Sequence, residues 1–204
     1  MNNIFDYIEE HTSNKPFIGV VPAVVTNNKD PDGLGRVKVK YMWSGDENET
    51  YWARIALPMA GNGKGMFFIP EVDDEVLVAF EMGDLRFPYI IGVLWNGKDS
   101  PPEKDINIKK IKSSNGHEII LNDKSDVVQI KTSAGDEITF ENDVKITIKS
   151  GDNSIEINKQ SKEIKIKSSL NLSIEATKLE IKGTNVDIKA DGILTLQGSL
   201  VRIN

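Results

Sequence analysis

The second half of this 204-residue chain repeats a pair of apolar residues separated by one residue, which is polar in every pair but one. The pairs are Ile106/Ile108, Ile119/Leu121, Val128/Ile130, Ile138/Phe140, Ile146/Ile148, Ile155/Ile157, Ile164/Ile166, Leu172/Ile174, Leu179/Ile181, Val186/Ile188, Leu194/Leu196 and Val201/Ile203. From the second pair onward, each pair follows the last after 7 to 10 residues, and the later steps are the shorter ones. Successive side chains of a strand point to opposite faces, so each pair places both apolar side chains on one face. Such a repeat predicts stacked strands with one apolar face.

One chain alone offers these strands no second apolar layer. Phe140 is the only aromatic residue of this half, so a sandwich core within one chain is excluded. A single-chain parallel β-helix, with several units in each coil, is the alternative. The regular, shortening step favours three chains that wind round one axis, each contributing one strand per level. As a monomer, the segment would expose strand edges without prolines, which is an aggregation hazard.

We therefore predict an obligate homotrimer in which the paired residues meet at the axis. The predicted trimer core consists of Ile119, Leu121, Val128, Ile130, Ile138, Phe140, Ile146, Ile148, Ile155, Ile157, Ile164, Ile166, Leu172, Ile174, Leu179, Ile181, Val186, Ile188, Leu194 and Leu196. The predicted tip consists of Val201 and Ile203. The Lys, Glu and Asp residues between them are expected to keep the outside of the shaft soluble.

The first half of the chain has a different composition. All eight prolines lie between Pro16 and Pro102, and all three tryptophans precede residue 100. Acidic residues exceed basic ones before residue 103 and balance them after it. We expect a short helical segment at 1–16, with helix at 3–10, then a barrel at 17–100, a linker at 101–105 and a needle at 106–204. The proline pair at 101–102 is expected to stiffen the joint.

Short strand candidates separated by turn residues fill the predicted barrel. The candidates are Phe17–Thr26, Arg36–Trp43, Tyr51–Leu57, Gly65–Ile69, Glu75–Glu81 and Tyr89–Trp95. Within the second candidate, Val37, Val39 and Tyr41 alternate with basic residues, which is typical of a strand with one solvated face. Five or six strands of this length with Gly-rich connections indicate a small Greek-key barrel.

The sequence holds few residues suited to catalysis or metal binding. The chain has no cysteine and two histidines, His11 and His117, with no H-x-H or H-E-x-x-H motif. The loops at 28–33 and 61–65 lack the spacing of a calcium loop or a phosphate loop, and we interpret both as turns. We therefore predict no catalytic residue, no cofactor, no metal and no enzymatic activity. A net charge of -6 argues against a nucleic-acid partner.

Residues 17–102 resemble a known family along almost their whole length. The likeness lies in Ile18–Thr26, Asp30–Val39, Tyr51–Arg54, Pro58–Gly61, Gly63–Gly65, Phe68–Val72, Asp74–Phe80, Gly83–Asp84 and Gly92–Gly97. They are similar to the OB domain of the phage baseplate assembly protein V family and of the VgrG spikes of type VI secretion. The repeat is more loosely similar to the triple-stranded β-helix of those proteins. The fold class expected is all-β: an OB-type Greek-key barrel followed by an intertwined triple-stranded β-helix needle.

The resemblance implies the structural central spike of a baseplate, which pierces a target envelope when a sheath contracts. No hub domain precedes the barrel, so a separate hub protein is expected at the OB end. A PAAR-like tip protein is expected at the C-terminus, since the iron-binding H-x-H of some relatives is absent. We expect synthesis in the cytoplasm without a signal peptide, incorporation into a phage-tail-like particle or baseplate, and membrane contact only on puncture. The alternatives are a spike-borne cell-wall hydrolase and a receptor-binding tail fibre.

Overall fold

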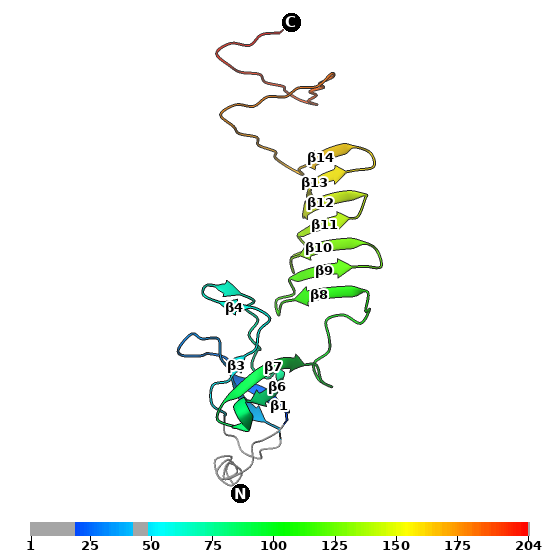
Figure 1. Ribbon diagram of the computed structural model, residues 1–204. Coiled ribbons are helices and arrows are strands. Elements are labelled where there is room, and N and C mark those ends of the chain that lie inside the picture. The colour runs from blue at the N-terminus through cyan, green and yellow to red at the C-terminus, as the bar shows by residue number, and fades with distance from the viewer. Residues whose placement is uncertain (1–18, 43–48, 204) are drawn as a thin grey trace. The chain divides into compact units, whose positions relative to one another are not determined.

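The computed structural model describes residues 19–42 and 49–203 (Figure 1). The helix expected at 3–10 lies outside these residues. The chain divides into two compact units, Met1–Asp105 and Ile106–Asn204, which are treated separately below.

Five strands of the first unit form one sheet in the order β2-β1-β6-β7-β3. They are β1 (Val21–Asn27), β2 (Lys38–Tyr41), β3 (Arg54–Ile55), β6 (Glu75–Phe80) and β7 (Pro88–Leu94). Neighbouring strands are antiparallel except β3 and β7. Val37 and Ala53 join the two edges through paired backbone hydrogen bonds of 3.1 and 2.8 Å. The sheet thus curves back on itself, which is consistent with the OB-type barrel predicted.

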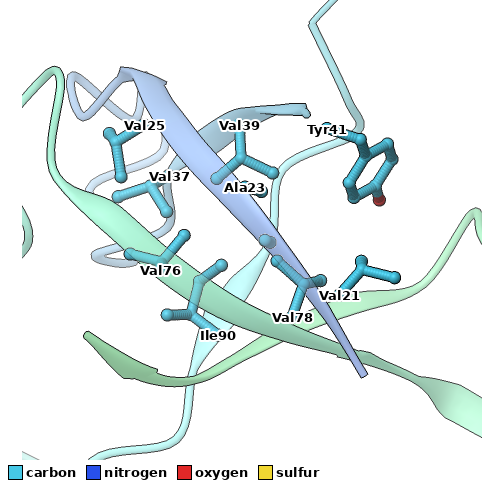
Figure 2. Packing of buried hydrophobic residues seen from close by; sticks show 10 residues of the cluster. Val21, Ala23, Val25, Val37, Val39, Tyr41, Val76, Val78 and Ile90 are labelled. Atoms are coloured by element: carbon cyan, nitrogen blue, oxygen red, sulfur yellow. The ribbon is translucent and has the colours of Figure 1, made fainter. Parts of the chain in front are cut away.

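Alternating residues of β1, β2 and β6, together with Val37, Ala53 and Ile90, fill the barrel (Figure 2). The core consists of Val21, Ala23, Val25, Val37, Val39, Tyr41, Ala53, Val76, Val78 and Ile90. The expected alternation is confirmed in β2, where Val39 and Tyr41 are buried while Lys38 and Lys40 are not. The ring of Tyr41 meets that of Phe80 edge-on, with centroids 5.8 Å apart, a favourable aromatic geometry.

The prediction of a strand at Gly65–Ile69 is wrong, because residues 66–69 form no strand. A two-stranded hairpin forms instead from β4 (Ala60–Gly61) and β5 (Lys64–Gly65). Gly65 has a φ of +147°, and a Cβ there would lie 2.5 Å from the carbonyl oxygen of Met59. Position 65 therefore requires glycine, because only glycine accepts that backbone beside another chain segment.

A carboxylate holds the loop between β1 and β2. Asp30 accepts backbone N–H bonds from Asp32, Leu34 and Arg36 at 3.1, 3.1 and 3.2 Å. The Arg36 side chain donates two more bonds to Asp30, of 2.8 Å from Nε and 2.7 Å from Nη2. The guanidinium holds the pKa of Asp30 well below its usual value, because these bonds favour the charged carboxylate.

Replacing Asp30 with asparagine is expected to lower the melting temperature of the barrel, because the Arg36 fork loses its charged acceptor. Asp32→Asn is the matched control, since exposed Asp32 accepts only a single side-chain bond from Arg36. The folded pKa of Asp30 is depressed, so its contribution is complete above the unfolded value of 3.8 and is lost as the pH falls below it. The difference in melting temperature between wild type and Asp30→Asn should therefore shrink as the pH is lowered from 7 to 2, since the loss begins near 3.8 and is complete only below the depressed folded pKa. Parallel curves would contradict this role.

Seven strands of the second unit form an antiparallel meander in chain order (Figure 1). They are β8 (Ile108–Lys112), β9 (Glu118–Asn122), β10 (Val127–Lys131), β11 (Glu137–Glu141), β12 (Lys145–Ser150), β13 (Asn153–Asn158) and β14 (Glu163–Lys167). Each of the six connections contains a residue with positive φ. These residues are Gly116, Asp126, Gly135, Asp143, Gly151 and Lys162. Such a residue lets two strands reverse direction within a short loop.

The backbone changes character after β14. No strand lies between residues 168 and 203. That segment is extended and bends at 169–170, 177–178, 184–185, 191–192 and 199, which repeats every seven to eight residues. No residue from 163 to 203 has a positive φ. The segment therefore never reverses into a hairpin.

The expectation that each chain contributes one strand per level from residue 106 onward needs correction. Between Ile108 and Lys167, neighbouring strands belong to the same chain and pair through hairpins. The steps of eight to ten residues in this region accommodate a five- or six-residue strand and a reversing turn. For residues 168–203, where the step is seven or eight, intertwining between chains stays a prediction.

Candidate assembly interface

Most apolar residues of the meander form two rows across one face of the sheet, which we call the apolar face. Strand register places each pair directly opposite the next. The first row consists of Ile111, Ile119, Ile130, Ile138, Ile148, Ile155 and Ile166. The second consists of Leu121, Val128, Phe140, Ile146, Ile157 and Ile164. Direct cross-strand contact makes these rows continuous.

The apolar face is the more exposed face of the sheet. Ile138 on this face is half-buried, and its other large hydrophobic side chains are between 36% exposed, at Ile146, and 69% exposed, at Ile164. On the other face, the side chains of Lys110 and Glu118 are only 13% and 15% exposed. A soluble protein normally covers its apolar surface and solvates its charges. This inversion indicates a sheet whose apolar face is covered in an assembly.

The polar face carries a row of alternating charges. Lys112, Glu118, Lys131, Glu137 and Lys149 are successive cross-strand partners. Lys112 lies 3.0 Å from Glu118, and its hydrogen bond lowers the pKa of that carboxyl group. A slip of one residue in any strand would move these charges to the other face. The row therefore supports the observed register. The row is not among the features predicted from the sequence; its signal is a change in the sign of charge between positions that hairpin pairing brings together.

Other polar groups on this face find partners across strands. Gln129 donates from Nε2 to Glu137 at 2.9 Å and to the hydroxyl of Thr139 at 3.0 Å. Lys145 lies 3.6 Å from both Glu141 and Glu156. Pairs that remain partly open to solvent contribute little stability each. Their effect is a hydrated surface on which the charges are balanced.

The predicted core residues fall into two structural groups. Those from Ile119 to Ile166 lie together on the apolar face. Those from Leu172 to Leu196 lie in the unpaired segment, 51–67% exposed, and the chain does not bring them together. Val201 and Ile203 of the predicted tip are also exposed there. Their burial in a trimer stays a prediction.

The first repeat pair does not extend the rows. Ile106 precedes β8 and is exposed, while Ile108 lies opposite Asn122, on the polar face. Lys109 and Ile111 instead stand opposite Leu121 and Ile119. The β8–β9 turn sets this register, because the Ser113 N–H bonds the His117 carbonyl at 2.9 Å.

A second apolar surface lies on the barrel unit. A hollow of about 650 Å³ is lined by residues of the β1–β2 loop, β3 and the β4–β5 hairpin. Leu34, Met59 and Phe67 on its wall are exposed. Apolar surface of this kind is typical of a contact with another protein.

The described residues contain no group of three or more acidic or histidine side chains arranged to hold a metal ion. No helix within 19–42 and 49–203 has the length and hydropathy to cross a bilayer.

The barrel is similar to a domain of known proteins. Residues 21–95 match the family model of the type VI secretion system/phage-baseplate injector OB domain. The spike protein VgrG4b of Pseudomonas aeruginosa is 37% identical over 93 residues, or 42% of this chain. The spike protein VgrG1a of the same organism is 31% identical over 134 residues, or 57% of this chain. The actin cross-linking toxin VgrG1 of Vibrio cholerae is 35% identical over 75 residues, or 35% of this chain. These matches span only 12%, 21% and 7% of the respective relatives.

Proposed function

We propose that this chain, a VgrG-like baseplate or spike protein by its injector OB domain, is the structural central spike of a contractile injection machine and works as a homotrimer. The observation that carries the proposal is the exposed apolar face, whose two rows run from β9 to β14. A needle that buries this face around an axis has a continuous core and a charged, hydrated outer surface.

Three copies suit the second unit better than two. Two sheets packed face to face would cover the apolar face of the meander. The same dimer would leave strand edges open along residues 168–203, which form no strand pairs within the described chain. In a closed ring of three, the edge of each copy meets the next copy and no edge is left over.

The proposed role is mechanical, with no catalytic step. An axial force on the needle acts on many backbone hydrogen bonds at once, and all must break before the strands shear apart. We propose that this rigidity lets the spike pierce an envelope when a sheath contracts. A separate hub protein at the OB end and a PAAR-like tip protein at the needle end complete the proposed assembly. Two of the similar proteins, VgrG4b and VgrG1a, are named spike proteins, which supports this role.

The mass in solution tests the proposal. Light scattering at micromolar concentration should give about three times the 22.7 kDa of one chain. A trimer that persists on dilution supports an obligate assembly. A folded monomer or dimer would contradict the proposal.

Two simple assays separate the alternatives from a spike. A spike-borne hydrolase releases soluble fragments from purified peptidoglycan, and a receptor-binding fibre sediments with intact cells of its host. We expect the purified trimer to do neither. Release of fragments or saturable cell binding would favour the respective alternative.

A further inference from the structure

An asparagine is followed by a glycine at three places in the chain, residues 62–63, 96–97 and 115–116. Asparagine is a thermolabile residue, and a following glycine leaves it open to attack by the next backbone nitrogen, because no Cβ shields that nitrogen. The nitrogen and the Cγ of the asparagine must first be free to approach each other. The structure describes all three steps and restrains them differently.

The side chain of Asn96 is held by hydrogen bonds at both of its polar atoms. Its Nδ2 donates to the carboxylates of Glu75 at 2.9 Å and of Asp99 at 3.2 Å. Its Oδ1 accepts from the backbone N–H groups of Lys98 and Asp99 at 2.8 and 2.7 Å. A rotation of this side chain toward the nitrogen of Gly97 disrupts these bonds. The fold therefore protects the step at 96–97.

Asn115 lies in the β8–β9 turn, where the backbone is held instead of the side chain. The N–H of Gly116 donates to the carbonyl of Ser113 at 2.9 Å. The N–H of His117 donates to the hydroxyl of the same serine at 3.1 Å. The Gly116 nitrogen keeps its proton while it makes this bond, so it is a poor nucleophile. The turn therefore slows the step at 115–116.

Neither restraint applies at Asn62. Asn62 and Gly63 form the exposed turn of the β4–β5 hairpin, which stands clear of the five-stranded sheet of the barrel (Figure 1). Within the part of the chain that the structure describes, the Asn62 side chain and the Gly63 N–H make no hydrogen bond. A Cβ added at Gly63 would meet nothing within 4 Å. A cyclic product at this turn therefore has room to form.

We propose that Asn62 is a site of spontaneous deamidation. The Gly63 nitrogen attacks the Cγ of Asn62, so that a C–N bond forms and the Cγ–Nδ2 bond breaks. The amide proton of Gly63 leaves with Nδ2 as ammonia. Water then opens the succinimide ring at either carbonyl, which yields aspartate, or isoaspartate with the backbone running through Cγ. Nothing is oxidised or reduced, and water is the only co-reactant.

The product changes the wall of the hollow on the barrel unit. Gly61 and Gly63, on either side of Asn62, line this hollow together with Arg54 and Lys64. These two basic residues are the only charged ones among its described lining residues, so the unmodified wall is basic. Deamidation adds a carboxylate at its rim, and isoaspartate also lengthens the backbone of a turn that closes a short strand pair. This inference does not depend on the proposed function.

Peptide mapping of the full-length protein tests the proposal. Trypsin cleaves after Lys and Arg, so the three steps fall into separate peptides, 55–64, 87–98 and 113–124. Samples are held at pH 8 in the folded state and, in parallel, in concentrated urea. Mass spectrometry follows the exchange of the side-chain amide for a carboxyl group in each peptide, and fragmentation assigns the residue. Chromatography separates the aspartate and isoaspartate forms.

In the folded protein, we expect Asn62 to convert several-fold faster than Asn96 or Asn115. In urea, the three rates should be similar, because each step is then the same dipeptide in an unfolded chain. Asn62→Gln is the matched variant, since it keeps an amide at the turn but forms a cyclic product much more slowly. It should abolish the product in peptide 55–64 and leave the other two rates unchanged.

Two results in the folded protein would overturn the proposal. One is conversion of Asn96 or Asn115 at least as fast as that of Asn62, which would show that the hydrogen bonds do not protect those steps. The other is a rate at Asn62 far below its rate in urea, which would show that the hairpin turn itself protects the residue.

Discussion

Replacing Ile155 with aspartate is expected to convert the trimer into separate chains. Ile155 stands between Ile148 and Ile166 on the apolar face and is 39% exposed in one chain. In the proposed trimer, the substitution places three carboxylates at the axis. Loss of apolar contact costs about 1 kcal/mol per chain, since most of the side chain is already covered by its own sheet. Desolvation costs several kcal/mol for each carboxylate, so the charges dominate the effect.

The pH dependence of this variant follows from the same cause. Like charges in a site of low dielectric raise the pKa of a carboxyl group and favour its neutral form. The Ile155→Asp chains should therefore be monomeric at pH 7 and should begin to reassemble as the pH falls through the raised pKa. Light scattering across this range gives the measurement.

The neighbouring residue provides a matched control. Ser154 lies on the polar face, directly opposite Lys149 and Lys167. Ser154→Asp inserts a carboxylate between two ammonium groups and continues the alternating row of charges. A cross-strand pair of opposite charge contributes roughly 0.2–1 kcal/mol, so this variant should stay trimeric with an equal or higher melting temperature. Similar masses and melting temperatures for the two variants would show that the apolar face is not the interface.

Truncation of Ile90 to alanine is expected to unfold the barrel at much lower denaturant concentration and to leave the trimer intact. Ile90 is 1% exposed and lies in the barrel core on β7. Removing a buried isoleucine side chain costs about 2–5 kcal/mol through lost transfer energy and the cavity left behind. The chain divides into two compact units, so the second unit should not share this loss.

Tryptophan fluorescence isolates the barrel transition, because Trp43, Trp52 and Trp95 all precede the second unit. Far-ultraviolet circular dichroism then follows the strands of the second unit. Ile91→Ala is the matched control, since Ile91 neighbours Ile90 on the same strand but is 43% exposed; its effect should be within about 0.5 kcal/mol. Equal shifts for both variants would contradict the barrel core, and loss of the trimeric mass in Ile90→Ala would contradict independent units.

Local alternation along the chain was enough to predict several features. A strand repeats every two residues, so the spacing of Val37, Val39 and Tyr41 already indicated which side chains fill the barrel. The same spacing predicted that Ile119 to Ile166 share one face. Composition also distinguished the two halves, because an aromatic- and proline-containing barrel and a repeat of short strands follow different packing rules.

Strand pairing was decided only in three dimensions. Apolar–polar alternation is the same whether a strand pairs with its own chain or with another copy, so the repeat could not distinguish a meander from an intertwined helix. The backbone of the turns is what makes neighbouring strands pair within one chain. Three of the six reversals use Asp126, Asp143 and Lys162, and the positive φ of these residues is not evident from their type. Register likewise moved Ile108 to the polar face, because one residue of offset changes the face of every side chain in a strand.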